Sequence, residues 1–363
     1  MATVTKTIGT SSRDYSTINA WEADLNSASI YSNGDTAVGE MYADSTFTGA
    51  TSTIENGSAI GGSAGHDLAL IKLTVHADSR HDGTAESGAL LKPTADSGHD
   101  QGIIRINVDN VIIEWLDISM DSLDSKNTNK AIVLTGTNDD CIIRNMLIHD
   151  KGGNPGSTGP MGIHVIGAGA SSDTLSIQNN IIYNLVETGG DTAQGVNTNQ
   201  WAGTASFYNN TIYNIDAQGS SKQAWGFVYG NVASAVTNVK NNLVAKMVAD
   251  GAASNERAYQ KFNGSSTENA SNNLSDDTVT TSAYEAPGSS SLEDKTLAEI
   301  SFVSTTGGSE DLHIDADSDC VDAGVDLGTT NGVEIDINGR NRDSQGDTWD
   351  IGAHEFVDRK SVV

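Results

Sequence analysis

Five ionisable residues near the middle of the chain have the side chains that cleavage of an acidic polysaccharide requires. A lyase needs a cation beside the uronate carboxylate and a base that removes the neighbouring proton. The residues that supply such groups are Arg144, His149, Asp150, Lys151 and His164. A half-exposed histidine on a strand is more often an ordinary surface residue, so we keep catalysis here as a hypothesis only.

Two adjacent aspartates, Asp139 and Asp140, form a second candidate site. A glycoside hydrolase needs two carboxyl groups roughly 5–9.5 Å apart on one face of the protein. This pair comes directly before a predicted strand, where aspartates commonly form a turn. We therefore interpret Asp139 and Asp140 as turn residues.

Carboxylates also recur with the spacing of a calcium-binding loop. Positions 1, 3, 5 and 12 of such a loop correspond to Asp315, Asp317, Asp319 and Asp326. Cys320 stands at the sixth position, which requires glycine, and the last ligand is aspartate where the loop requires glutamate. The segment therefore fails as an EF-hand. Calcium remains a hypothesis, and no other cofactor is expected.

Two interleaved repeats indicate which elements position these residues. One series, at intervals of 30 to 34 residues, places asparagine at Asn145, Asn179, Asn209, Asn241 and Asn272. The other, at intervals of 29 to 33 residues, places a small residue before an apolar run at Gly102, Ala131, Gly162, Gly195, Gly226 and Ala258. Because two independent series share one period, we infer a true structural repeat.

Each repeat contains short runs of alternating apolar and polar residues separated by turn-forming residues. Propeller blades are longer, at roughly 40–50 residues, so the repeat predicts an all-β solenoid whose coils pair in parallel. Asparagine tolerates the left-handed conformation of tight turns, and identical side chains stack in register. We therefore expect the five asparagines to form a structural ladder.

The NNxIYN segments at this spacing resemble the right-handed parallel β-helix of the pectate-lyase-like superfamily. The resemblance covers roughly residues 60–280. Residues 13–25 are similar to the helix that caps the amino end of such solenoids, and residues 311–324 and 334–356 to their carboxy-terminal ending. It implies a single-stranded right-handed β-helix with a short N-terminal capping helix and a C-terminal cap.

This resemblance divides the chain into three parts. They are an N-terminal cap with entry strands (1–60), the β-helix repeats (61–280) and a C-terminal cap region (281–363). Coils of about 30–34 residues are expected in the middle part.

The charge and composition exclude several classes of function. Twenty Lys and Arg against 48 Asp and Glu give a net charge of −28, which repels nucleic acid and anionic lipid. No apolar run approaches the length of a membrane span, and the amino terminus does not resemble a secretory signal. Two cysteines are too few for a disulfide framework. We therefore expect a protein made in a host cytoplasm, without nucleic acid or membrane as a partner.

Phage tailspikes, fibres and head-decorating proteins resemble this chain in using β-helices, and its YSTIxxW opening (15–21) is similar to openings in phage structural proteins. The resemblance implies a virion protein, either a capsid decoration or a tail-associated adhesin that binds a host-surface glycan. Its partners would be other capsid or tail proteins and a cell-surface polysaccharide, and only the resemblance points to a homotrimer. Two alternatives stay open: a polysaccharide lyase or glycoside hydrolase on the same scaffold, and a bacterial surface adhesin.

Overall fold

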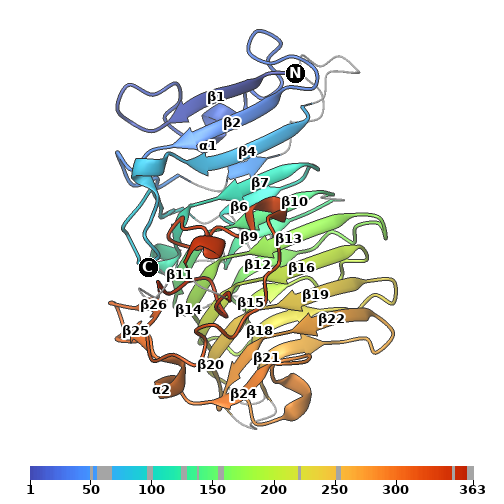
Figure 1. Cartoon of the computed structure of the whole chain (residues 1–363). Coiled ribbons are helices and arrows are strands. Elements are labelled where there is room, and N and C mark those ends of the chain that lie inside the picture. The colour runs from blue at the N-terminus through green and yellow to red at the C-terminus, as the bar shows by residue number, and fades with distance from the viewer. Residues whose placement is uncertain are drawn as a thin grey trace.

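The computed structural model describes residues 1–49, 52–54, 68–95, 101–123, 129–136, 139–153, 159–219, 222–250, 255–345 and 348–357. Its strands form a parallel β-solenoid with three long sheets, which confirms the predicted all-β solenoid (Figure 1). The expected boundary between residues 60 and 61 lies outside the described residues.

The three sheets of the solenoid are called A, B and C here. Sheet A contains β1 (Thr3–Ile8), β2 (Thr36–Met41), β4 (Leu70–Val75), β7 (Val111–Glu114), β10 (Cys141–Arg144), β13 (Thr174–Gln178), β16 (Thr204–Tyr208), β19 (Val236–Lys240) and β22 (Thr267–Ser271). Sheet B contains β5 (Leu90–Leu91), β8 (Asp117–Ser119), β11 (Leu147–Lys151), β14 (Ile181–Glu187), β17 (Thr211–Ala217), β20 (Leu243–Ala249), β23 (Leu274–Asp276) and β24 (Leu292–Lys295). Sheet C contains β3 (Ser52–Ile54), β6 (Ile104–Ile106), β9 (Lys130–Leu134), β12 (Met161–Val165), β15 (Ala193–Asn197), β18 (Ala224–Tyr229) and β21 (Glu256–Lys261).

The two repeats of the sequence mark two places in every coil. The asparagine series lies at the corner between sheets A and B, where each of the five residues has a positive φ of 51° to 57°. The glycine series lies in sheet C. A Cβ added to Gly195 would come within 2.7 Å of the Ile212 side chain and 2.8 Å of the Gly226 carbonyl oxygen, so the close approach of backbone and core requires glycine there.

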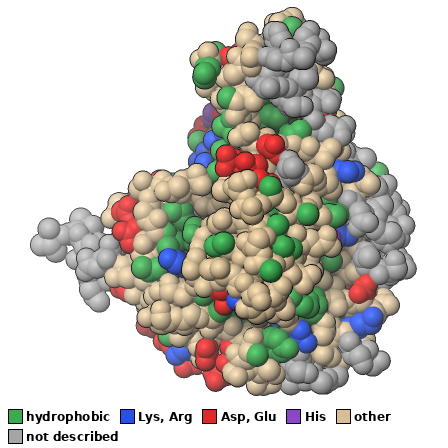
Figure 2. Space-filling model, turned by 90° about the vertical axis from the view of Figure 1, so that its right-hand side faces the viewer, with side chains coloured by type: hydrophobic (Ala, Val, Ile, Leu, Met, Phe, Trp, Pro, Cys, Tyr) green, Lys and Arg blue, Asp and Glu red, His purple; other side chains and the backbone are tan. Residues whose placement is uncertain are grey.

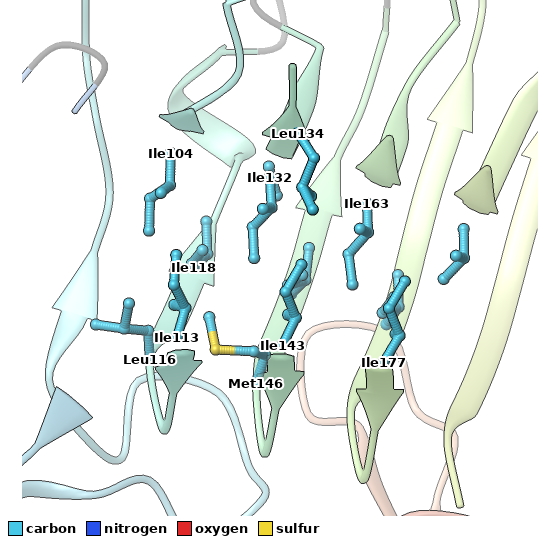
Figure 3. Close-up of a cluster of buried hydrophobic side chains, with 14 of the residues drawn as sticks. Ile104, Ile113, Leu116, Ile118, Ile132, Leu134, Ile143, Met146, Ile163 and Ile177 are labelled. Carbon is cyan, nitrogen blue, oxygen red and sulfur yellow. The ribbon is translucent and has the colours of Figure 1, made fainter. Parts of the chain in front are cut away.

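Columns of aliphatic side chains fill the inside of the solenoid, as Figure 3 shows for the upper coils. Parallel pairing in register places the same inward position of successive coils side by side. In the lower coils the column of sheet C becomes aromatic, with Phe227 stacked on Tyr259 at a centroid distance of 5.5 Å. Phe227 also stacks across the core on Phe207 of sheet A at 5.2 Å. One continuous core therefore runs the length of the repeats.

The predicted N-terminal capping helix is confirmed, but it is shorter than the pattern over residues 13–25 indicated. Helix α1 (Ile18–Glu22) has Thr17 as its N-cap, whose side chain accepts a hydrogen bond from the Ala20 amide. Trp21 of α1 is fully buried and donates from Nε1 to the Tyr31 hydroxyl at 3.2 Å.

The region predicted as a C-terminal cap (281–363) has two parts: Ala286 and β24 close the lower end of the solenoid, and the residues after them cover its side. We call residues 297–356 the C-terminal layer; it contains α2 (Leu297–Ile300) and the antiparallel pair β25 (Phe302–Ser304) and β26 (Asp311–Ile314). In Figure 1 it runs back across the strands in orange and red. Helices α1 and α2 have five and four residues, and no described helix has the length and apolar character of a membrane span.

The C-terminal layer packs on sheet B through a second hydrophobic cluster. The strands contribute outward-facing residues such as Leu147, Ile181 and Tyr213, and the layer contributes Leu312, Ile351 and others. Sheet B is therefore apolar on both faces, as sheets covered on both sides are.

Candidate functional site

The corner asparagines connect the solenoid to the C-terminal layer. Each donates from Nδ2 to a backbone carbonyl of the layer at 2.7–3.1 Å, and the acceptors follow in reverse order along the chain. The pairs are Asn145 with Asp336, Asn179 and Asn209 with Val333, Asn241 with Val325, and Asn272 with Ala323. Within this row, Asn241 also donates to Asn209 Oδ1 at 3.0 Å.

A second row, one residue later, forms the continuous side-chain stack. Asn180, Asn210 and Asn242 each donate from Nδ2 to Oδ1 of the asparagine in the next coil, at 2.9, 2.9 and 3.1 Å, and Asn273 ends the row. All four are fully buried. We call these four residues the inner row. The repeated NN pair in the sequence is its signal, although only the first asparagine of each pair was predicted to be structural.

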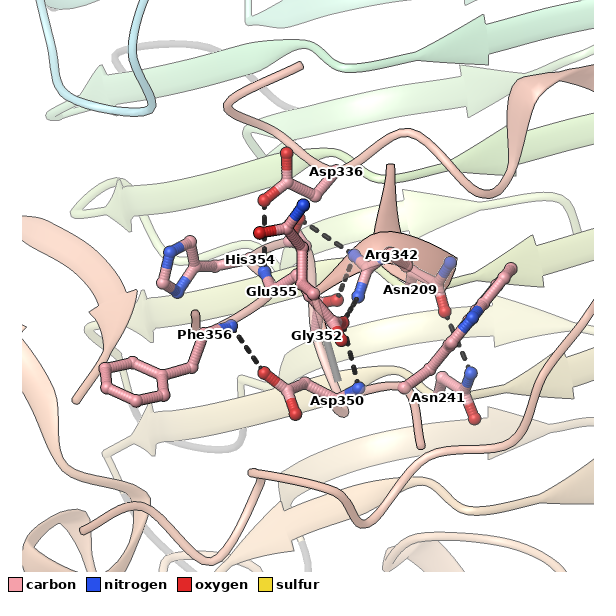
Figure 4. A network of polar contacts seen from close by, with 12 residues as sticks. Asn209, Asn241, Asp336, Arg342, Asp350, Gly352, His354, Glu355 and Phe356 are labelled. Carbon is pink, nitrogen blue, oxygen red and sulfur yellow. Dashed lines mark hydrogen bonds and ion pairs between the residues drawn. The ribbon is translucent and has the colours of Figure 1, made fainter. Parts of the chain in front are cut away.

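Arg342 holds the C-terminal layer against the corner asparagines (Figure 4). Its guanidinium is fully buried, forms an ion pair with Glu355 at 2.8 Å and donates to the Gly352 and Ala353 carbonyls. It also reaches Asn179 Oδ1 at 3.3 Å. The layer is thus joined to the solenoid by buried polar contacts as well as by the apolar cluster.

Arg144 lies at the edge of this contact region. It pairs with Glu114 at 2.6 Å and donates to the Asn331 carbonyl of the layer. Burial opposes ionisation of Glu114, but Arg144 and Lys72 outweigh it and hold the pKa of that carboxyl below its usual value. The cation of Arg144 is therefore matched by a buried carboxylate.

His149 is buried between two carboxylates on the outer face of sheet B. Its Nε2 lies 2.8 Å from Asp117 and its Nδ1 lies 2.8 Å from Asp150, and its ring stacks on Tyr183. Burial lowers the pKa of His149, but the two carboxylates outweigh that effect and raise it to about 9. Below that pH the imidazole is a cation with both nitrogens occupied, so it has no lone pair with which to accept a proton.

Asp150 lies opposite Glu310 of the C-terminal layer. Asn184 donates from Nδ2 to both, at 2.9 Å to Asp150 and 2.8 Å to Glu310. Because they share this donor, the two carboxylate oxygens are less than about 6 Å apart. However, the amide nitrogen of Asn184 fills the space between them, where a glycosidic oxygen would have to lie. We therefore interpret this contact as structural: it holds the 305–311 loop on sheet B.

Lys151 follows Asp150 on β11 but is in register with Leu185 of the core, and His164 lies on another sheet. Lys151 is fully buried and donates to the carbonyls of Leu123, Gly152 and Gly153 at 2.6, 3.3 and 3.1 Å. His164 lies on β12 in sheet C, half-buried, whereas His149 lies on β11 in sheet B. The structure therefore does not bring the five candidate residues into one site.

The candidate metal ligands have separate local contacts. Asp319 pairs with Lys295 at 2.6 Å, and Asp315 and Asp326 accept hydrogen bonds from the nearby amides of Ala316 and Gly328. Throughout the described part of the chain, no three His, Cys, Asp or Glu side chains gather as a metal site would require.

Asp139 and Asp140 are confirmed as turn residues. Asp140 has a φ of 52°, and Asp139 Oδ1 accepts hydrogen bonds from the amides of Asp140 and Thr174 at 2.9 and 2.8 Å. Asp140 Oδ1 accepts from the Thr174 hydroxyl at 2.5 Å. Both carboxylates therefore tie one coil to the next.

A groove of about 580 Å³ lies between the outer face of sheet A and the C-terminal layer. Its walls are strands β10, β13 and β16 on one side and residues 327–333 on the other. Hydroxyl and amide groups and one aromatic ring share its lining with apolar side chains. The former are Thr174, Ser176, Gln178, Thr204, Ser206, Tyr208, Thr330 and Asn331, and the latter include Ile142, Leu175, Leu327 and Val333. Asp140 is the one ionisable carboxyl in the lining. Sequence patterns gave no sign of this groove, because residues more than 100 positions apart form its two walls.

No protein-family model matches this chain, and no curated protein sequence matches it at a significant level.

Proposed function

We propose that this chain is a bacteriophage virion structural protein of the pectate-lyase-like β-helix kind, and that it binds a glycan on the host surface. The observation that carries the glycan-binding part is the groove between sheet A and the C-terminal layer. Ligand sites are concave and combine a few oriented polar groups with apolar or aromatic surface. The hydroxyls, the amides and the Tyr208 ring of this groove have that composition.

The mechanical character of the fold supports a role in a virion. Each inner coil is held by neighbours on both sides, and a solenoid of this kind is stiff because every inner strand pairs with two others. Helix α1 covers the upper end, and the buried residues Val279 and Ala286 pack into the core near the lower end. The C-terminal layer adds a second buried cluster along one side. Such a molecule is suited to survive outside a cell.

The predicted alternative, a lyase or hydrolase, gains no specific support at the residues proposed for it. Arg144 and His149 are each paired with buried carboxylates, and Asn184 lies between Asp150 and Glu310. A catalytic base needs a free lone pair, and a hydrolase needs room for the scissile oxygen between its carboxyl groups. We therefore propose binding and not cleavage.

Two measurements test this proposal. Mass spectrometry of purified phage particles should detect the chain in stoichiometric amounts, and its absence from particles would reject the virion role. A glycan array probed with the purified protein should show retention on a subset of bacterial surface glycans. Release of reducing or unsaturated ends from any bound glycan would instead restore the enzymatic alternative.

A further inference from the structure

The outer face of the four lower strands of sheet A carries no carboxylate, whereas Lys72, Glu114 and Arg144 lie on the strands above. Strands β13, β16, β19 and β22 each place three residues on this face, and these align in register from coil to coil. Ser176 and Gln178 of β13 are buried, and the other positions are half-buried or exposed. These positions are Thr174, Ser176, Gln178, Thr204, Ser206, Tyr208, Val236, Asn238, Lys240, Thr267, Asn269 and Ser271. None carries a carboxylate and one carries a cation, in a chain with 48 acidic residues.

We call these twelve positions the neutral face. Uncharged stretches of surface are visible from another side as well, since in Figure 2 acidic side chains gather in small groups separated by tan and green surface. The charge of −28 is therefore unevenly distributed. A face without carboxylates attracts no cationic partner, while the charge of the whole molecule repels an anionic one.

The polar groups of the neutral face are held in fixed orientations. Asn269 donates to Asn238 Oδ1 at 3.0 Å, and Asn238 donates to Ser206 Oγ at 3.0 Å. At the groove, Ser176 donates to Gln178 at 2.8 Å, and Gln178 donates to the Asn331 carbonyl at 2.7 Å. Preorganised donors and acceptors lower the entropic cost of binding a ligand.

These rows repeat along the solenoid axis with the strand spacing of about 4.8 Å. The groove lies at the upper end of the neutral face, where β13 and β16 belong to both. Tyr208, half-buried on β16, lies where the two meet and offers a ring that packs against the apolar side of a sugar. The twelve positions are therefore regularly spaced, rich in hydroxyls and free of carboxylates, with Lys240 as their one charge.

We propose that the neutral face binds an uncharged polysaccharide, whose chain lies across β13, β16, β19 and β22 and enters the groove at Tyr208. This inference rests on the proposed glycan-binding function and adds the chemical class and placement of the ligand. Four strands span about 15 Å, so affinity should rise with oligosaccharide length and then level off once the chain exceeds that span.

Calorimetry with neutral gluco- and manno-oligosaccharides of increasing length, and with polygalacturonate and alginate as anionic probes, tests the proposal. The neutral probes should bind, and Tyr208→Ala should weaken that binding by about tenfold. Ser206→Trp should abolish it by filling the groove. Tyr284→Ala removes a half-buried tyrosine outside the neutral face and serves as the matched control, with unchanged affinity expected. Thermal unfolding of each variant establishes that it is folded.

The outcomes separate the two proposals. Binding of the anionic probes in preference to the neutral ones would overturn the neutral ligand and leave glycan binding intact. Neutral binding that is equally affected, or equally unaffected, by Tyr208→Ala and Tyr284→Ala would overturn the placement. No binding of either class, together with an empty glycan array, would overturn the proposed glycan-binding function and this inference with it.

Discussion

At the scale of single residues, burial gives the ionisable side chains of the central coils a structural role. Asp117 and His149 are almost inaccessible to water, and an unpaired charge in such a place is strongly disfavoured. The chain solves this by placing a carboxylate on each imidazole nitrogen. The buried pair Asp117 and His149 is therefore matched in charge, and Asp150, whose side chain is 36% exposed, completes the contacts of the imidazole.

His149 gives the first prediction. Its pKa is raised in the folded state from 6.5 to about 9, so the stability it contributes is present below pH 6.5 and is lost as the pH rises through 9. The loss should amount to about 3 kcal/mol. Urea unfolding at a series of pH values should show it in the natural chain and much less in His149→Gln, while His76→Gln behaves like the natural chain. Imidazole carbon shifts typical of neutral histidine at pH 7.5 would contradict the assignment.

At the scale of the elements, four corners between sheets A and B carry two adjacent asparagines whose side chains bond in different directions. The first asparagine takes a positive φ and points its amide to the C-terminal layer, while the second points along the inside of the coil and bonds to its copies. A one-residue shift moves a side chain to the other side of the chain. The NN pair therefore stabilises the stack of coils through its second residue and binds the C-terminal layer through its first.

Asn210 tests the inner row. It donates to the Ile177 carbonyl and to Asn242, and its Oδ1 accepts from Asn180. Asn210→Ala leaves several buried groups without partners and should cost about 3 kcal/mol of unfolding free energy. Asn238→Ala, which removes a half-exposed asparagine of the neutral face, should cost less than about 1 kcal/mol of unfolding free energy. Equal shifts of the urea midpoint in the two variants would contradict an inner stack as a main support of the coils.

At the scale of the whole molecule, the solenoid is completed by its own C-terminal layer. Sheet B presents apolar residues on its outer face, and the corner asparagines beside them present side-chain amides that require acceptors. One covering segment satisfies both, because it supplies apolar side chains and backbone carbonyls together. The same segment forms the second wall of the groove.

Arg342 should control how firmly the layer is held. Arg342→Met leaves Glu355 buried without its partner, and breaking a buried pair in this way costs about 3–5 kcal/mol. Limited proteolysis followed by mass spectrometry should then show faster cleavage within residues 321–345, with the repeats still protected. Arg340→Met, an exposed neighbour on the same segment, is the control. Equal cleavage of both variants would show that the apolar cluster alone holds the layer.

The repeat period, strand lengths and turn residues were enough to predict the solenoid, and the apolar stripe of residues 13–25 was enough to predict α1. Each of these features depends on neighbours in sequence or on identical positions one coil away. The doubly apolar strands of sheet B, such as Ile181 and Ile182, also contained the signal for a covering layer. No local pattern in the sequence indicated that residues 297–356 would be the segment that covers sheet B.

The sequence by itself therefore determined the coil, because local alternation and a fixed period leave few other ways to bury its apolar residues. The tertiary structure decided where the C-terminal layer lies, which asparagine row stacks, and which ionisable groups neutralise one another. Those outcomes depend on contacts between residues such as Asn179 and Arg342, 163 positions apart. Only the folded chain brings such partners together, and the groove on sheet A exists for the same reason.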